Sequence, residues 1–265
     1  MPSKNFKNKN VVITGASSGI GERLAKDMAA SGARVILLAR STEKLEKIKT
    51  EIMNQDCLEP YLYTLDVSEP TQIEVVFKEI FTKVKGVDIL INNAGFGKFD
   101  HFIEADMEDI EAMFQVNVLG LMNCTKLVLP EMVKNGSGQI INIASQAGKI
   151  GTPKSSGYSA SKHAVLGFSN SLRMELLKTG VHVMTVNPGP IRTNFFNIAD
   201  ESGSYVKNVE KFMLTPEKVS QEIIKGILRK KREVNLPRFM NLGSKIYQAA
   251  PGVVEKIGGR FFEMK

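Results

Sequence analysis

Short runs of apolar residues alternate with longer segments of helical period along most of this 265-residue chain. The apolar runs are mostly uninterrupted, which is typical of strands covered on both faces of a parallel sheet. We predict strands at residues 10–14, 34–39, 61–65, 88–91, 139–143, 182–187 and 233–236. We predict helices at residues 19–31, 42–54, 69–84, 106–134, 156–178 and 216–231. This alternation predicts an α/β fold built on a parallel sheet.

The chain contains no internal repeat, low-complexity tract or linker that would divide it, and its length suits one large domain. Residues 1–237 are therefore expected to form a single catalytic domain. Within it, residues 188–215 lack clear periodicity and carry Phe195, Phe196 and Phe212, so we predict a lid over a substrate pocket. Residues 238–265 form a C-terminal helical extension of the same domain.

Composition indicates the cellular compartment of the protein. The hydrophobic fraction of 43% is ordinary for a globular core. Cys57 and Cys124 lie far apart without C-x-x-C spacing, which argues against a disulfide framework and a zinc site and indicates a reducing compartment. The first ten residues show no apolar signal region, and no stretch reaches the roughly 18 unbroken apolar residues of a membrane span. We therefore expect a soluble cytoplasmic protein.

The net charge of +7 is concentrated at one end of the chain. From Lys225 to Lys265 the sequence has ten basic and three acidic residues, so this segment alone carries 10 − 3 = +7. Nucleic acid is not expected as a partner, because neither an aromatic stacking platform nor a recognition motif accompanies the charge.

The tail itself has two amphipathic stripes. Leu242 and Ile246 stand at helical spacing, and Val253, Ile257 and Phe261 follow four residues apart after the Pro251-Gly252 break. The pattern favours helices that pack over the substrate pocket or against a second subunit. The alternative is peripheral docking on an anionic membrane that delivers a lipophilic substrate.

A glycine-rich turn follows the first predicted strand and opens a helix. The run T-G-A-S-S-G-I-G places glycines at 15, 19 and 21, which allow a tight turn and a close backbone approach to a pyrophosphate. Its position in a βαβ unit favours dinucleotide binding over a mere structural turn. The predicted cofactor contacts here are Gly15, Ser17, Ser18, Gly19, Ile20 and Gly21.

The end of the second predicted strand bears on the choice of cofactor. In dinucleotide folds an acidic residue here binds the ribose 2′-hydroxyl, whereas an arginine accommodates a 2′-phosphate. This chain has Ala39 followed by Arg40, a planar bidentate phosphate donor. The sequence therefore favours NADP(H) over NAD(H).

Candidate reacting groups converge on the carboxyl ends of the predicted strands. Tyr158 and Lys162 lie four residues apart in Y-S-A-S-K, which puts both on one helix face, where the ammonium is expected to make the phenol more acidic. Ser145 follows the fifth strand, and Asn117 lies in the helix before it. Ligands bind outside the carboxyl ends of strands in open parallel sheets, so these groups can share one site.

These motifs together make the chain resemble the short-chain dehydrogenase/reductase family over roughly its first 195 residues. The resemblance is carried by T-G-A-S-S-G-I-G, N-N-A-G, I-N-I-A-S, Y-S-A-S-K and N-P-G-P-I-R-T. It implies a Rossmann-type, doubly wound, seven-stranded parallel sheet of strand order 3-2-1-4-5-6-7, and a homodimer or homotetramer.

The resemblance also implies roles for matching residues. Tyr158 would be the general acid/base, and Lys162 would lower its pKa and bind the nicotinamide ribose. Ser145 would orient the substrate oxygen, and Asn117 would hold a water that relays protons to Lys162. The remaining cofactor contacts would be Asp66 and Val67 beside adenine, Asn93, Ala94 and Gly95 along the cofactor, and Pro188, Gly189, Ile191 and Thr193 at the carboxamide.

We therefore predict an NADP(H)-dependent oxidoreductase that moves a hydride between the nicotinamide and a carbonyl or alcohol, with a hydrophobic ketone, aldehyde or secondary alcohol as substrate. The alternative is a catalytically silent NADP(H)-binding sensor or scaffold on the same fold. No metal site is expected, because His101, His163 and His182 are not arranged as ligands.

Overall fold

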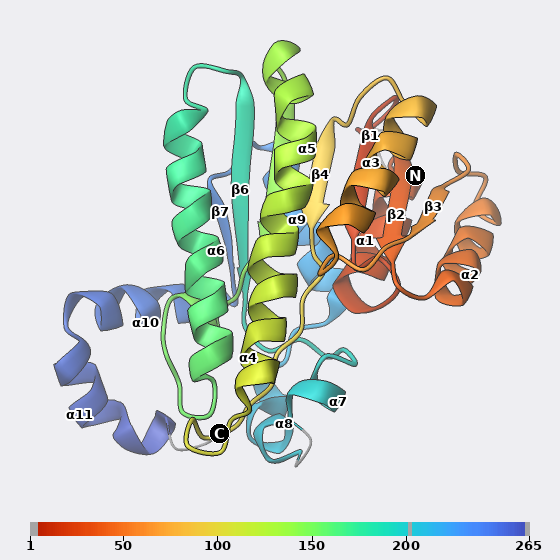
Figure 1. Ribbon diagram of the computed structural model, residues 1–265. Coiled ribbons are helices and arrows are strands. Elements are labelled where there is room, and N and C mark those ends of the chain that lie inside the picture. The colour runs from red at the N-terminus through yellow and green to blue at the C-terminus, as the bar shows by residue number, and fades with distance from the viewer. Residues whose placement is uncertain (1–4, 201–202, 263–265) are drawn as a thin grey trace.

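The computed structural model describes residues 5–200 and 203–262, and its centre is a seven-stranded parallel sheet (Figure 1). The strand order is β3-β2-β1-β4-β5-β6-β7, as the family resemblance implies. The strands are β1 (Asn10–Thr14), β2 (Arg34–Ala39), β3 (Tyr61–Thr64), β4 (Ile89–Asn92), β5 (Gly138–Ile143), β6 (Val181–Pro188) and β7 (Glu233–Leu236). Every predicted strand is present, with boundaries that differ by at most one residue.

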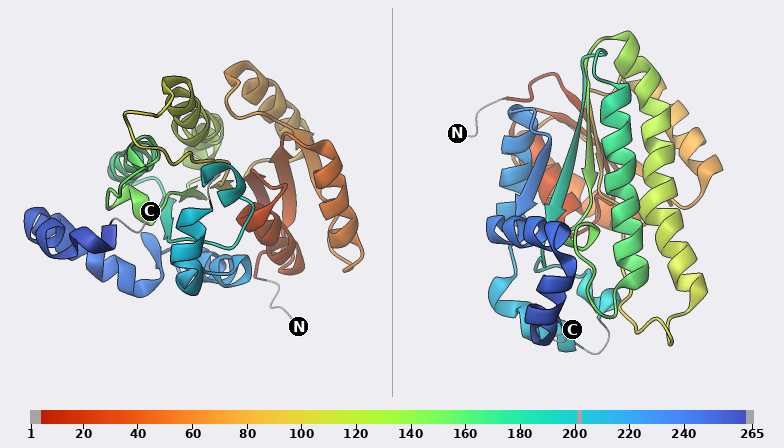
Figure 2. Two further views of the ribbon diagram at one scale, coloured as in Figure 1. Left: turned by 90° about the horizontal axis from the view of Figure 1, so that it is seen from below. Right: turned by 90° about the vertical axis from the view of Figure 1, so that its left-hand side faces the viewer.

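Helices connect the strands and cover both faces of the sheet (Figures 1 and 2). Between β1 and β6 these are α1 (Gly19–Ala30), α2 (Thr42–Met53), α3 (Pro70–Lys83), α4 (Met107–Phe114), the π-helix η1 (Gln115–Gly120), α5 (Leu121–Lys134), the 3-10 turn η2 (Gln146–Gly148) and α6 (Ser156–Glu175). After β6 come α7 (Phe196–Ala199), α8 (Ser204–Val209), the 3-10 turn η3 (Glu210–Phe212), α9 (Pro216–Leu228), α10 (Arg238–Ala249) and α11 (Pro251–Phe262).

Alternate residues of each central strand enter different cores, which explains the uninterrupted apolar runs. Val11 and Ile13 of β1 pack with α1, α2 and α9, whereas Val12 between them packs with α3, α5 and α6. All three side chains are completely buried. A sheet with helices on both faces can hold apolar residues at every position of a strand.

The long predicted helix over residues 106–134 is interrupted in the structure. Its middle is the π-helix η1, which contains Asn117. A π-turn widens a helix by one residue and is frequent at functional sites. By length and hydropathy alone the segment Met107–Lys134 could also cross a membrane, but here it packs on the sheet and carries a residue of the candidate site.

The predicted lid contains more regular structure than its sequence indicates. Residues 188–215 include α7, α8 and η3, and an isolated bridge joins Ile191 to Leu214 at its base. Backbone bonds from Arg192 N to Leu214 O (2.9 Å) and from Leu214 N to Pro190 O (2.9 Å) close the segment into a loop. The lid is therefore anchored at both ends beside β6.

The basic excess of residues 225–265 divides between opposite ends of the sheet. β7 runs parallel to β6, so the turn before it lies at the amino edge and α10, which follows it, lies at the carboxyl edge. Lys225, Arg229, Lys230, Lys231 and Arg232 belong to the amino edge. These five basic residues therefore lie far from the apolar stripes of the tail.

Candidate active site

A glycine cradle at the carboxyl end of β1 leaves room for a phosphate group. Gly15 and Gly19 have φ values of +63° and +58°, a backbone region that favours glycine. A Cβ at Gly15 would lie 2.8 Å from the Cα of Ala94, and a Cβ at Gly21 would collide with the carbonyl oxygen of Gly15. The cradle therefore presents bare backbone and the N-terminus of α1, which suits an anionic pyrophosphate.

The N-N-A-G segment after β4 holds the cradle in place. The Asn93 side chain donates to the carbonyl oxygens of Thr14 and Gly15, both at 3.0 Å. The Thr14 hydroxyl accepts from the backbone amides of Asn93 and Ala94, also at 3.0 Å. Because these bonds join the ends of β1 and β4, the two loops that line the predicted cofactor site move as one unit.

Cations surround the end of β2, where a ribose 2′-phosphate would lie in a fold of this kind. The Arg40 guanidinium is 78% exposed and lies 3.9 Å from an oxygen of Asp66. Although burial opposes it, hydrogen bonds from Ser68 and the charge of Arg40 lower the pKa of Asp66. Ser41 and Lys44 also line the cavity here, and the sequence reasoning missed both because it stopped at the strand end.

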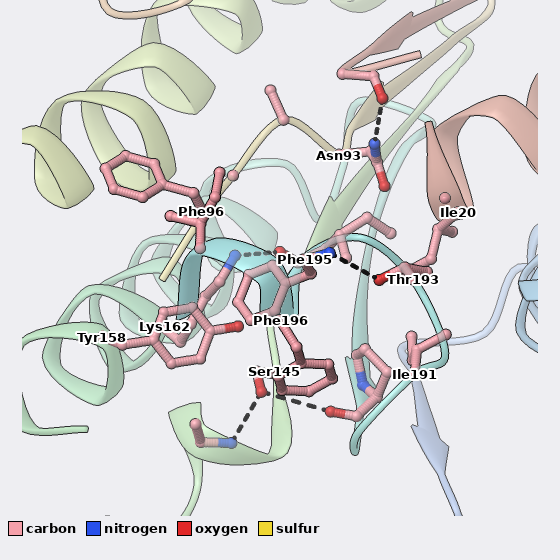
Figure 3. A pocket seen from close by; sticks show the side chains of 18 of the residues that line it. Ile20, Asn93, Phe96, Ser145, Tyr158, Lys162, Ile191, Thr193, Phe195 and Phe196 are labelled. Atoms are coloured by element: carbon pink, nitrogen blue, oxygen red, sulfur yellow. Dashed lines mark hydrogen bonds between the residues drawn. The ribbon is translucent and has the colours of Figure 1, made fainter. Parts of the chain in front are cut away.

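Ser145, Tyr158 and Lys162 meet at the carboxyl ends of β5 and β6 (Figure 3). The Ser145 hydroxyl accepts from Ala147 N at 3.1 Å and points towards the carbonyl oxygen of Pro188 at 3.5 Å. The Lys162 ammonium donates to the carbonyl oxygen of Ile143 at 2.9 Å. Tyr158 and Lys162 are only 8% and 5% exposed, so both groups work out of contact with bulk water.

Burial controls the protonation of this pair. It raises the pKa of Tyr158 to about 12, and a hydrogen bond with Ser145 acts in the opposite direction. It lowers the pKa of Lys162 to about 8. Desolvation of the phenolate is the largest influence on the pKa of Tyr158 in this structure, and the lowering of that pKa by Lys162 stays a prediction. Tyr158 is therefore a protonated phenol at neutral pH, beside an ammonium whose centre lies 5.8 Å from its ring centroid.

Asn117 braces the loop beside Lys162. Its side chain accepts from Phe96 N at 3.0 Å and donates to Phe96 O at 2.9 Å and to the Ser161 hydroxyl at 3.1 Å. A Cβ at Gly95 would lie 2.8 Å from its amide oxygen and 3.4 Å from the Lys162 nitrogen. The structure thus places Asn117 next to Lys162 as predicted, and the water relay stays a prediction.

The glycine cradle, the end of β2 and the reacting groups border one cavity of about 1040 Å³. Except for Gly21 and Asn117, which lie just behind its wall, every predicted site residue lines it. Within the described part of the chain, no cluster of three potential metal ligands is found. The cavity joins the glycine cradle to the reacting groups, so a dinucleotide and a second molecule can share it.

Aromatic side chains enclose the end of the cavity that holds Tyr158. Phe195 packs on the Tyr158 ring at 5.7 Å, and Phe99 lies 5.7 Å from the same ring and 5.5 Å from Tyr205. The predicted lid supplies Phe195, Phe196 and Tyr205, whereas no motif or periodicity pointed to Phe99, which lies in an irregular loop. Phe239, Met240 and Gly243 of α10 also line the cavity, but Leu242 and Ile246 of the predicted apolar stripe are exposed and do not line it.

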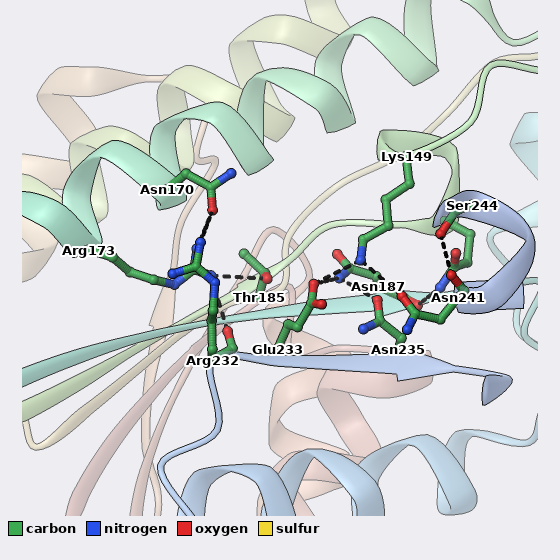
Figure 4. A network of polar contacts seen from close by, with 11 residues as sticks. Lys149, Asn170, Arg173, Thr185, Asn187, Arg232, Glu233, Asn235, Asn241 and Ser244 are labelled. Atoms are coloured by element: carbon green, nitrogen blue, oxygen red, sulfur yellow. Dashed lines mark hydrogen bonds and ion pairs between the residues drawn. The ribbon is translucent and has the colours of Figure 1, made fainter. Parts of the chain in front are cut away.

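A polar network fixes the Ser145 turn to the neighbouring elements (Figure 4). Lys149 donates to Glu233 of β7 at 2.8 Å and to Asn241 of α10 at 3.4 Å. Asn187 donates to the same Glu233 carboxylate at 3.3 Å, and the Gln146 amide donates to Asn187 O at 2.8 Å. The network therefore ties the turn that carries Ser145 to the helix that closes the pocket.

Comparisons with known proteins show which family the chain belongs to. The family model described as short chain dehydrogenase matches residues 9–202. The chain is 38% identical over 244 residues to the Drosophila melanogaster dehydrogenase/reductase SDR family protein 7-like, covering 88% of this chain and 74% of that protein.

Solved structures give the same result. An alcohol dehydrogenase from Thermococcus sibiricus, complexed with 5-hydroxy-NADP, is 30% identical with a TM-score of 0.77, covering 86% of this chain and 95% of that one. A short-chain dehydrogenase/reductase from Burkholderia phymatum in complex with NAD shares the fold with a TM-score of 0.86 at 21% identity, covering 94% of this chain and 96% of that one. This chain is a member of the short-chain dehydrogenase/reductase family of oxidoreductases.

Proposed function

We propose that this protein is an NADP(H)-dependent carbonyl reductase that acts on a hydrophobic ketone or aldehyde, or on the corresponding secondary alcohol in reverse. The observation that carries the proposal is the position of a buried, protonated Tyr158 between Ser145 and Lys162 at the aromatic end of a dinucleotide-sized cavity. A catalytically silent NADP(H) sensor would need the cradle but none of these reacting groups.

The glycine cradle, the N-N-A-G segment and residues 188–193 would hold the cofactor, which supplies the hydride when bound. The Tyr158 hydroxyl is the proton donor to the carbonyl oxygen, because burial keeps it protonated at neutral pH. The Ser145 hydroxyl orients that oxygen, and the Lys162 charge favours the phenolate that forms when the proton leaves. The aromatic wall keeps water away from the reacting atoms.

The preference for NADP(H) rests on the charges at the end of β2. Ala39 offers no carboxylate to a ribose hydroxyl, and Arg40 and Lys44 line the cavity there. The Thermococcus sibiricus relative was solved with an NADP derivative. In a cytoplasm, where NADPH is the usual reductant, this preference makes reduction the working direction.

The substrate class follows from the wall around Tyr158. Apart from Lys162, the described residues of that wall have aromatic, aliphatic or uncharged polar side chains. Burying an anion against such a surface is costly, whereas an apolar substrate gains about 25 cal/mol for each Å² removed from water. A neutral, hydrophobic carbonyl compound fits this end of the cavity.

The proposed cellular state is a cytoplasmic homodimer or homotetramer with peripheral contact of residues 238–265 with anionic membranes. Cys57 and Cys124 are both free, which suits a reducing compartment. Light scattering after size-exclusion chromatography tests the oligomer, and a purely monomeric protein would contradict it.

The decisive experiment follows NADPH oxidation with a panel of apolar ketones and aldehydes, using the wild type and Tyr158→Phe. We expect wild-type turnover, a loss of about 10²–10⁴-fold in kcat in the variant, and an unchanged dissociation constant for NADPH. Substantial turnover in Tyr158→Phe would overturn the role of Tyr158. NADPH binding without turnover of any carbonyl would favour the silent sensor.

A further inference from the structure

Helix α10 is turned so that its polar face points into the protein. Ser244 is 1% exposed, and its hydroxyl donates to Asn241 O at 3.0 Å. The Asn241 side chain accepts from Lys149 at 3.4 Å as part of the network that holds the Ser145 turn (Figure 4). These contacts fix the rotation of α10 about its axis.

The opposite face of α10 carries an apolar stripe that meets solvent. Phe239, Leu242 and Ile246 follow each other at three- and four-residue spacing and are 60%, 63% and 52% exposed. Phe212 of η3 is 54% exposed and extends the stripe through an edge contact with Phe239 at 6.3 Å. A helix on the surface of a soluble domain normally turns such a stripe inward, so an exposed stripe of this kind indicates an interaction site.

This surface borders the mouth of the cavity. Phe239 lines the cavity and also belongs to the exposed stripe, and its neighbours Met240 and Gly243 line the cavity as well. Ile198 of α7, which is 51% exposed, lines the cavity from the lid. An apolar molecule can therefore pass from the stripe into the pocket across an apolar rim.

The charge around the stripe decides between partners. α10 contains Arg238 and Lys245 but no acidic residue, whereas in η3 the charge of Lys211 is offset by the neighbouring Glu210. From Arg238 to Lys265 the sequence has five basic residues against two acidic ones. A second copy meeting this surface through a two-fold axis would set like charges against each other, whereas anionic lipid headgroups neutralise them.

We propose that the stripe formed by Phe212, Phe239, Leu242 and Ile246 docks on an anionic phospholipid bilayer, with the cavity mouth against the lipid. An apolar carbonyl substrate then enters from the membrane rather than from water. The delivery step rests on the proposed carbonyl reductase activity, whereas the docking step does not.

Vesicle flotation tests the docking step. The probe is phosphatidylcholine vesicles with and without phosphatidylserine, and the proteins are the wild type, Leu242→Glu/Ile246→Glu, and the control Met174→Glu/Leu177→Glu. The control residues are 68% and 71% exposed near the end of α6, at the amino edge of the sheet. Neither changed pair lines the cavity.

We expect the wild type and the control to float with phosphatidylserine vesicles and to be released by salt, because screening shortens from about 10 Å at 0.1 M to about 3 Å at 1 M. The α10 variant should partition at least about tenfold less. Equal flotation of all three proteins, or none with wild type, would overturn the proposal. A drop in oligomeric state in the α10 variant alone would assign the stripe to a subunit interface and would also overturn it.

A kinetic comparison tests delivery. The α10 variant should raise KM several-fold for a long-chain ketone dissolved in phosphatidylserine vesicles and leave both kinetic constants for a short water-soluble ketone unchanged. An equal KM for the vesicle-dissolved ketone in variant and wild type would overturn delivery. If the wild type reduces neither ketone, the proposed carbonyl reductase activity is wrong. The flotation experiment still tests whether the stripe docks on the membrane.

Discussion

The two ends of the cavity are built from different parts of the chain. The cofactor end consists of backbone and small residues from consecutive strand ends, joined by side-chain bonds such as those from Asn93 to the carbonyls of Thr14 and Gly15. The substrate end consists of large aromatic rings from an irregular loop and the lid, which touch one another through ring contacts. Phe239 of α10 also lines the cavity.

This difference in construction implies that cofactor binding and substrate selection depend on separate parts of the cavity. Hydrogen bonds fix the position of the cradle within a narrow range, so neighbouring atoms cannot move to accommodate a substitution there. Ring contacts are individually weak and tolerate sliding, so the aromatic wall can change with little effect on the cradle. Substitutions at one end should therefore leave the measured properties of the other end intact.

Lys162 lies where the two ends meet, and its removal should have the largest effect. Burial lowers its pKa to about 8, whereas Tyr158 titrates only at about 12. As pH rises through about 8, Lys162 loses the charge that favours the phenolate, so kcat/KM for reduction should fall above that pH. Lys162→Met should lower kcat about 10²-fold or more and abolish this fall.

The control for this prediction is Lys162→Arg, which stays charged because the guanidinium pKa exceeds about 12. Its activity should be reduced by the change of shape, but its pH profile should stay flat across pH 8. A fall near pH 8 that survives in Lys162→Arg would assign the titration to another group.

Gly15→Ala tests the stiffness of the cofactor end. The new Cβ would lie 2.8 Å from the Cα of Ala94 at a residue whose φ is +63°. The positive φ alone costs about 1–2 kcal/mol for a non-glycine residue, and the backbone contact adds to it. We expect the dissociation constant for NADPH, measured by fluorescence titration, to rise about tenfold or more.

Gly136→Ala is a matched control, because Gly136 has nearly the same φ of +61° and no atom within 4 Å of its Cβ position. It should lower Tm through backbone strain but leave NADPH binding unchanged. If both variants weaken NADPH binding equally, strain in the fold rather than crowding of the cradle is responsible.

The same contrast explains what the sequence could predict. Strand positions followed from apolar runs, and the cradle and reacting groups followed from short motifs, because each depends on local spacing. Phe99 and Phe239 were missed as pocket residues because they join the cavity only through the tertiary packing of distant segments. The burial that raises the pKa of Tyr158 was missed because helical spacing reveals a neighbouring charge but not the degree of burial.

Cofactor preference should change without altering the substrate end. Ala39→Asp with Arg40→Leu removes a cation and adds a carboxylate where a 2′-phosphate would lie. A hydrogen bond to a charged group contributes about 1.5–3 kcal/mol, so the NADPH/NADH ratio of kcat/KM should fall about 10- to 100-fold. The exposed Arg229→Leu serves as the charge control, and a ratio unchanged in the double variant would contradict the assignment of Arg40.

Phe195→Ala should give the smallest effect and the sharpest test of independence. Its ring packs on Tyr158 at 5.7 Å and on Phe196 at 5.3 Å, while the cradle lies at the other end of the cavity. Removing the ring widens the substrate end, so KM for bulky ketones should change a few-fold relative to small ones. The dissociation constant for NADPH should stay within about twofold of the wild-type value, a difference below about 0.5 kcal/mol.

Phe102→Ala provides the comparison for Phe195→Ala, because Phe102 is 65% exposed at the same edge of the sheet and does not line the cavity. It should change neither KM nor NADPH binding. If Phe195→Ala instead weakens NADPH binding tenfold, the lid braces the cofactor as well as the substrate. The two ends of the cavity would then be mechanically coupled through residues 189–195, because the Thr193 side chain lies 3.1 Å from the position that a Cβ of Gly19 would take.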